Sequence, residues 1–225
     1  MLVATAALAG CFANEAHDTL GTMTATTGRV MLDTALATEH GEGPHGGTET
    51  FTVRAAEEIG LVIHADMWPD ERLTVTVLDG AGAEAYRATF GTDSFDERHV
   101  AQRLTGVPGS WSLTWEANED LFRVARVSVL AADGADPTET VTFQEDRGHH
   151  FLRVTGSMAG WGGTAEARIV GPDGSTVWSR TVSGTTGPLR ERVDATEGPY
   201  RLEVEPGDWT GVADLRVTGV FQGEG

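Results

Sequence analysis

The chain has 225 residues, of which 40% are hydrophobic, 22% are charged and 29 are glycine. This composition suits packed cores in one large or two ordinary domains, and it argues against wholesale disorder. The formal net charge is −18, and all 16 basic residues are arginine. Because such a field repels phosphate backbones, no nucleic-acid partner is predicted.

Segment 1–11 has the features of the end of a secretory signal. Residues 2–10 form an apolar run ending in small side chains, and Cys11, the only cysteine, follows. The run is too short to span a bilayer, and 8–11 (Leu-Ala-Gly-Cys) resembles the lipobox of prokaryotic lipoproteins, whose thiol is acylated. No basic residue precedes the run, and an incidental cysteine in an apolar N-terminus is the alternative. We expect lipidation at Cys11 and an exported protein anchored on the outer side of the cytoplasmic membrane.

The region 12–47 is predicted to be a tether between the anchor and the folded part. Residues 39–47 are glycine-rich and contain no apolar side chain beyond Pro44, which is typical of a flexible linker. Residues 22–34 are more apolar than a linker needs. For them we expect a hairpin around Thr27-Gly28-Arg29 or an edge strand added to the first domain.

From residue 48 onward the chain repeats itself with a period of about 90 residues, since the sequence TETFTV at 48–53 recurs as TETVTF at 138–143. Each copy continues with a tryptophan, an apolar strand, a glycine-bearing turn and an aromatic residue, in the same order. Apolar and polar residues alternate as in half-buried strands, and Asp-Gly turns separate the strands. The sequence therefore predicts an all-β fold of two tandem antiparallel β-sandwich domains, residues 48–132 and 138–225, related by an internal repeat.

The short linker between the two copies contains Pro137, so we expect the domains to sit end to end with limited freedom. Aromatic residues recur at matching positions of the copies, as in Trp68 and Trp161 or Trp111 and Tyr200. We interpret them as core or inter-sheet packing rather than as stacking surfaces for a ligand.

The closing strands of the second copy resemble those of pre-peptidase C-terminal domains and related jelly-roll modules of secreted proteins. The resemblance rests on 198–204 (GPYRLEV) and 208–215 (DWTGVADL); the first copy matches only the first half, at 109–113. It implies an accessory role in binding or spacing and transfers no functional residue. The acidic, lysine-free composition separately resembles that of haloarchaeal proteins, with a GC-rich genome as the alternative explanation.

Motifs of catalysis are missing from the sequence: there is no Gly-x-Ser-x-Gly, no His-Glu-x-x-His, no phosphate-binding glycine loop and no dinucleotide fingerprint. Paired carboxylates such as Asp96 and Glu97 are expected on the solvated surface of so acidic a chain. We therefore predict that the protein is not an enzyme, and we predict no cofactor, with calcium as the one possible exception.

Metal binding is a more specific alternative to a protein without any bound ligand. Imidazoles in the glycine-rich tether share a transition metal such as copper when they come together, and carboxylates near the inter-domain linker offer the oxygens that calcium prefers. The candidates are His40 and His45 in the tether, Asp133, Asp136 and Glu139 at the linker, and the acidic loop 116–120. Solvated loops are the alternative in each case.

Taken together, these features predict a lipid-anchored cell-envelope protein that binds or displays without catalysis, for an unknown protein or glycan partner. One alternative is a calcium- or copper-binding exported protein whose site lies at the domain junction. Another is the accessory subunit of an exported enzyme. An exposed apolar patch would favour a protein partner, whereas a cleft with converging oxygens or imidazoles would favour metal or solute binding.

Overall fold

A computed structural model describes residues 17–37, 46–91, 94, 96–118, 125–132, 138–186 and 188–221. These residues form sixteen β-strands, and every pairing between them is antiparallel. The predicted all-β class is thereby confirmed. Within the described ranges there is no apolar helix of bilayer-spanning length.

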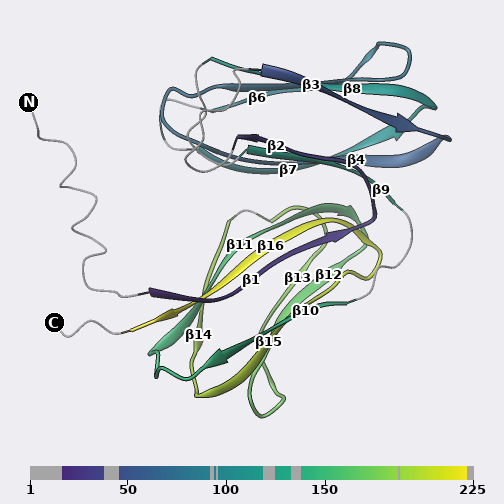
Figure 1. Ribbon diagram of the computed structural model, residues 1–225. Coiled ribbons are helices and arrows are strands. Elements are labelled where there is room, and N and C mark those ends of the chain that lie inside the picture. The colour runs from purple at the N-terminus through teal and green to yellow at the C-terminus, as the bar shows by residue number, and fades with distance from the viewer. Residues whose placement is uncertain are drawn as a thin grey trace, which may run out of the picture.

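The N-terminal sandwich consists of two four-stranded sheets, with the orders β2-β9-β4-β7 and β3-β8-β5-β6 (Figure 1). Its strands are β2 (Arg29–Ala37), β3 (Gly46–Val53), β4 (Glu57–Met67), β5 (Leu73–Leu78), β6 (Glu84–Phe90), β7 (Asp96–Gly106), β8 (Gly109–Ala117) and β9 (Ala125–Ala131). The predicted alternation is clear in β5, where Leu73, Val75 and Val77 are completely buried and the residues between them are half-buried. Trp111 and Leu113 complete the core between the two sheets.

The C-terminal sandwich has the sheet orders β1-β16-β11-β14 and β10-β15-β12-β13. Its strands are β1 (His17–Thr27), β10 (Glu139–Glu145), β11 (Phe151–Gly162), β12 (Ala165–Val170), β13 (Thr176–Val182), β14 (Leu189–Asp194), β15 (Gly198–Glu205) and β16 (Trp209–Val220). Substituting β1 for β2 and β10–β16 for β3–β9 converts one sandwich into the other. Both have the eight-stranded jelly-roll arrangement, so the sequence repeat is also a repeat of topology.

The N-terminal region is not a simple tether, and this corrects the predicted domain boundaries. Strand β1 pairs with β16, from His17 opposite Val220 to Thr27 opposite Gly211, whereas β2 pairs with β9 of the other sandwich. The N-terminal sandwich is therefore inserted between the first two strands of the C-terminal one. The pairing of β1 is explained by burial, because its Met23 and Ala25 side chains complete the C-terminal core. Strand β2 forms the edge of the β2-β9-β4-β7 sheet in the N-terminal sandwich.

Of the two expectations for 22–34, an edge strand added to the first domain is met by β2. The alternative hairpin at Thr27-Gly28-Arg29 does not form, because here the chain passes from one sandwich to the other. Gly28 has a φ of +90°, and a Cβ at this position would lie 2.7 Å from the Ala131 carbonyl oxygen. Glycine is the residue that tolerates both conditions. The crossing is consequently tight.

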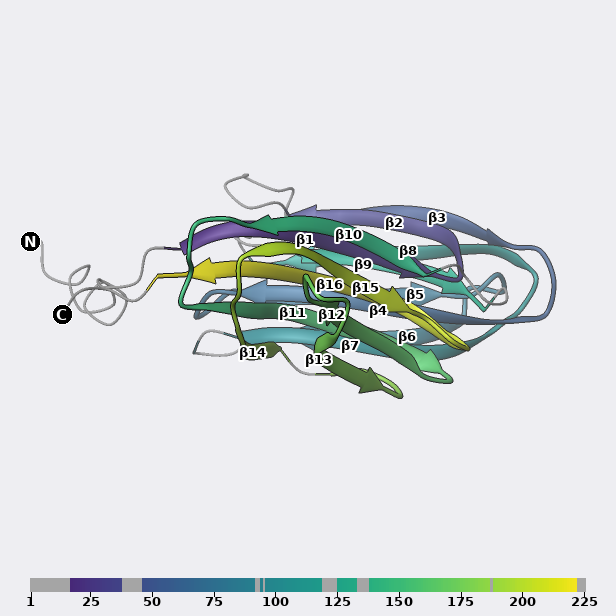
Figure 2. The same cartoon turned by 90° about the horizontal axis from the view of Figure 1, so that it is seen from below.

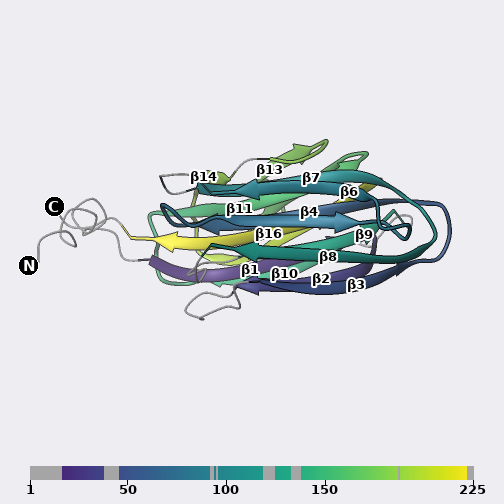
Figure 3. The same ribbon diagram turned by 90° about the horizontal axis from the view of Figure 1, so that it is seen from above.

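The two sandwiches stack face to face rather than end to end. Strands β11 and β16 lie against β4, β7 and β9, so the four sheets form successive layers (Figure 1), and the strands of both sandwiches run along one long axis (Figures 2 and 3). Val62, Leu130, Ala159 and Trp161 form a buried apolar cluster in this contact. These residues point away from the core of their own sandwich, and their burial stabilises the contact between the two sandwiches. The linker sequence did not predict this face-to-face contact.

Candidate metal centre

The junction between the sandwiches carries polar side chains next to its apolar contact. Residues of β4 alternate between the N-terminal core and the junction, and Val62, His64 and Asp66 belong to the junction side. In the antiparallel pairing of β4 with β7, His64 lies opposite His99 and Asp66 lies opposite Glu97. Directly opposite residues have Cβ atoms about 5 Å apart, so the two imidazoles stack, with ring centroids 4.3 Å apart.

Glu97 completes a compact cluster with the two imidazoles. Its Oε1 atom lies 3.1 Å from Nε2 of His99, whose side chain is only 3% exposed. One potential ligand atom from each of His64, Glu97 and His99 lies within 4.8 Å of the others. Two imidazoles with one carboxylate form a donor set that suits zinc and copper, whereas calcium prefers oxygen ligands throughout.

The surroundings favour the neutral form of His64. Burial lowers the pKa of its imidazole, and the neighbouring His99 lowers it further, against the opposing effect of Asp214 and other carboxylates. The neutral imidazole is the form that ligates metals. A cavity of about 30 Å³ adjoins the histidine pair, enough to hold a water molecule.

Arg126 also lines this cavity, but its charge is already compensated. Its Nε donates to Oδ1 of Asp33 at 2.8 Å, and a second guanidinium nitrogen contacts Oδ2. This hydrogen bond raises the pKa of Arg126 and lowers the pKa of Asp33. The paired arginine therefore places little net positive charge beside the cluster.

The junction opens into a cleft of about 670 Å³, within the size range of small-ligand sites. His64, Asp66 and Glu97 contribute to the wall that belongs to the N-terminal sandwich. The opposite wall, from the C-terminal sandwich, consists of Phe151, Arg153, Thr155, Gly156, Pro188, Leu189, Arg190, Glu191, Arg192, Asp214 and Arg216. His64 and Glu97 thus face a cleft with walls of unlike charge, whereas His99 lines the smaller cavity beside it.

Most of the residues expected from the sequence to bind metal or lipid lie outside the described residues: Cys11, His40, His45, Asp133 and Asp136. Glu139 is exposed at the start of β10, opposite Val204. In the acidic loop, the Asn118 amide accepts a hydrogen bond from the Arg72 N–H at 2.6 Å and donates one to the Asp70 carbonyl at 2.8 Å. Asn118 therefore closes a turn, and Glu119 and Asp120 of the same loop lie outside the described residues.

The histidine cluster was missed by the sequence reasoning, and Glu97 was misplaced by it. Glu97 was expected on a solvated surface, yet it lies on β7 with a side chain only 24% exposed, beside His99. The available signal was the spacing of two residues between Glu97 and His99, and between His64 and Asp66, which puts each pair on one face of a strand. The register of β4 against β7 was needed to bring the pairs together.

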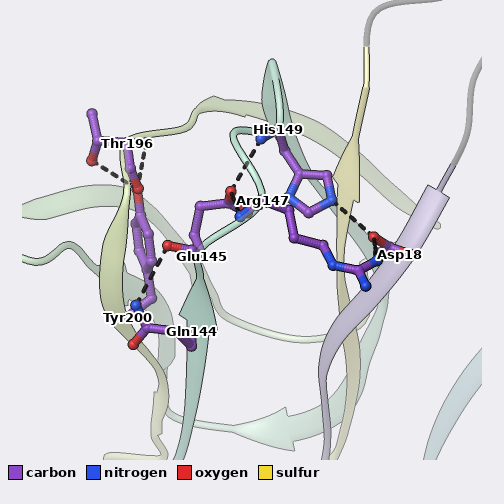
Figure 4. Close-up of polar contacts among 7 residues, drawn as sticks. All are labelled: Asp18, Gln144, Glu145, Arg147, His149, Thr196 and Tyr200. Carbon is purple, nitrogen blue, oxygen red and sulfur yellow. Dashed lines mark hydrogen bonds and ion pairs between the residues drawn. The ribbon is translucent and has the colours of Figure 1, made fainter.

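A second polar cluster, in which Glu145 and His149 are buried, ties β1 to the rest of the C-terminal sandwich (Figure 4). Glu145 Oε1 accepts the backbone N–H groups of Arg147 and His149 at 3.1 and 3.0 Å, and Oε2 contacts Nδ1 of His149. Nε2 of His149 lies 3.3 Å from Asp18, which also accepts from Arg147 at 2.7 Å. Both ring nitrogens are engaged by the protein, so this cluster is a structural clamp.

No protein-family model and no curated protein sequence matches the chain. Among solved structures, it is similar to the PBSX exported protein XepA, at 12% identity, 86% coverage of each chain and a TM-score of 0.30. It is similar to dimeric latent PorU from Porphyromonas gingivalis, at 10% identity, 91% coverage of this chain, 20% of that chain and a TM-score of 0.30. It is also similar to a chain of the Sulfolobus Turreted Icosahedral Virus, at 11% identity, 85% coverage of this chain, 60% of that chain and a TM-score of 0.23.

The protein is thus an all-β protein of two stacked, antiparallel sandwiches, with two histidines and a glutamate grouped at the junction.

Proposed function

We propose that this is a non-enzymatic, exported binding protein that holds a transition-metal ion, copper or zinc, with His64, Glu97 and His99. The observation that carries the proposal is the convergence of three ligand atoms within 4.8 Å at the sandwich junction. They come from two paired strands, β4 and β7, whose register is set by the buried residues that alternate with them. Ligands on paired strands are held more precisely than ligands on loops.

The charge of the whole chain supports a cationic ligand. A net charge of −18 raises the local concentration of cations around the protein and speeds their capture. The nitrogen donors select copper or zinc over calcium. The carboxylate of Asp214, on the C-terminal sandwich, acts on His64 across the junction, so a bound cation is stabilised from both sandwiches.

Export and anchoring through Cys11 belong to the same proposal and are supported by the resemblance of residues 8–11 to a lipobox. Cys11 precedes the first residue of β1, His17, by six residues, and an extended chain spans at most about 3.6 Å per residue. The lipid would therefore hold the C-terminal sandwich within roughly 20 Å of the bilayer.

Mass spectrometry of the N-terminal peptide from native membranes tests the anchor. We expect the mass of a lipid on Cys11 as the first residue, and we expect Cys11→Ala to release the protein from the membrane fraction. An unmodified Cys11 in membrane-extracted protein would refute the anchor and leave the metal site unaffected.

Calorimetric titration of the chelator-treated full chain tests the metal site. We expect one zinc or copper ion to bind per chain and to raise the melting temperature; a ligand at 100 times its Kd stabilises a protein by about 2.7 kcal/mol. Calcium at the same concentrations should have no comparable effect.

Matched variants locate the ion. His64→Ala and His99→Ala should each abolish the tight site, whereas His150→Ala removes an exposed imidazole outside the cluster and should preserve it. A combined change of His40 and His45 to Ala measures any contribution of the tether. The proposal fails if binding survives the loss of both His64 and His99, or if neither ion binds the unmodified chain.

A further inference from the structure

Four of the sixteen arginines of this acidic chain gather on one wall of the junction cleft. Arg153 lies on β11, Arg190 and Arg192 lie on β14, and Arg216 lies on β16, so they come from three adjacent strands of one sheet. The chain has 34 acidic residues, so carboxylates to neutralise such a group are plentiful. The concentration of positive charge therefore needs another explanation.

The register of the strands brings these like charges together. Arg153 lies directly opposite Arg192, and Thr155 lies between Arg190 on one side and Arg216 on the other. Directly opposite like charges destabilise a sheet. Among the described residues, Arg190 and Arg216 form no ion pair, and the Glu191 carboxylate is 4.0 Å from Arg180 instead. Arg190 and Arg216 therefore gain no stability from ion pairs within the described part of the chain.

The aromatic ring of Phe151 holds part of this group in position. The guanidinium carbon of Arg192 lies 4.2 Å from the centre of the ring, and that of Arg153 lies 5.6 Å from it. Stacking on a ring face orients a guanidinium without consuming its N–H donors. The donors of Arg192 consequently stay available, and a guanidinium binds carboxylate or phosphate groups through two parallel hydrogen bonds.

We propose that this wall binds a small ligand bearing at least two oxyanion groups, carboxylate or phosphate. Arg190 and Arg216 stand one strand to either side of Thr155, so their Cα atoms are about 10 Å apart at the usual strand spacing. A single oxyanion does not reach across that distance, but a ligand with two or more does. Asp66 and Glu97 on the facing wall repel anions, which directs the ligand to the arginines. The site requires no metal ion.

Calorimetry with the chelator-treated full chain at constant ionic strength tests the inference, with citrate, pyrophosphate and acetate as the probes. We expect saturable binding of citrate or pyrophosphate, at least about tenfold tighter than acetate. Preference for citrate identifies carboxylates as the natural groups, and preference for pyrophosphate identifies phosphates. Equal affinity for all three probes, or no binding at all, overturns the proposal.

Two charge-matched variants separate a built site from general attraction. The double change Arg190→Gln/Arg216→Gln should weaken binding at least about tenfold. Arg87→Gln/Arg201→Gln removes two exposed arginines, on β6 and β15, from the two sheets remote from the junction, and should leave binding unchanged. Equal weakening in both variants would show nonspecific attraction and refute the site.

The melting temperature of the double variant without ligand is an independent readout. Relief of like-charge repulsion should keep it at or above that of the unmodified chain. A lower melting temperature would assign these arginines to folding instead of binding and would likewise refute the inference.

Discussion

Gly60 of β4 and Trp161 of β11 contact each other at the sandwich junction, where the absence of a Cβ on Gly60 lets the two facing sheets approach. A Cβ on Gly60 would lie 2.3 Å from the indole ring of Trp161, and Trp161 is only 7% exposed. Trp68, at the matching position of the repeat, is 47% exposed, although the sequence predicted packing for both. Trp111 and Tyr200 do lie in the cores. An aromatic side chain is buried only where the opposite surface has room for it.

We predict that Gly60→Ala destabilises the chain by about 1–3 kcal/mol, because the new methyl group displaces the indole. Chemical denaturation measures the change. Combining it with Trp161→Leu, which removes the obstructing ring, should give a loss smaller than the sum of the two single losses. Strict additivity of the two changes would contradict direct contact as the cause.

Among the strands, β1 is the element whose attachment matters most, because it is an edge strand that connects the N-terminus to the fold. Its hydrogen bonds to β16 are supplemented at the N-terminal end by the clamp of Asp18, Arg147, His149 and Glu145. Pulling on a membrane anchor at Cys11 would load this end of β1 first. The clamp resists peeling at the position where peeling would start.

Replacing Glu145 tests the clamp and its pH dependence. Burial raises the pKa of Glu145, but the hydrogen bonds from the backbone and ring of His149 outweigh it, so the pKa lies below the ordinary 4.5. A folded-state pKa below the unfolded one stabilises the fold above about pH 4.5, and this contribution disappears as pH falls through the folded value. We expect Glu145→Gln to cost about 1–3 kcal/mol at neutral pH.

Denaturation of both proteins between pH 7 and pH 2 checks this prediction. The difference in unfolding free energy should stay constant above about pH 5 and shrink below about pH 4.5. Glu139→Gln, an exposed position on the same strand, should change stability by less than about 0.5 kcal/mol throughout. A difference between Glu145→Gln and the unmodified chain that grows in acid would refute the assigned direction.

For the whole molecule, the insertion makes the two sandwiches unequal. The N-terminal sandwich is continuous in sequence from β2 to β9, whereas the C-terminal one needs β1 from the far side of the insertion. Without β1, the β16 edge and the core around Met23 and Ala25 are exposed. The C-terminal sandwich therefore closes around the inserted one, and the junction cleft, with walls from both, forms only in the complete assembly.

We predict that residues 29–132 fold alone, that 138–225 do not, and that joining 17–27 to 138–225 through a flexible glycine-serine linker restores cooperative unfolding. Circular dichroism and thermal melting measure the outcome. The control exchanges Met23 with Thr24 in the joined segment, which turns the apolar side chain away from the core and should prevent the rescue. Cooperative folding of 138–225 without β1 would show that the added strand is dispensable.

The strands, the repeat and the all-β class could be predicted from the amino-acid sequence, because alternation of buried and exposed side chains is a property of each strand. The sequence left undecided where β1 pairs, how the sandwiches stack, and which titratable residues meet. Glu97 and His99 follow His64 by 33 and 35 positions, and only the register of β4 against β7 joins the three residues. Pairing and register depend on contacts remote in sequence, and the tertiary structure alone decides them.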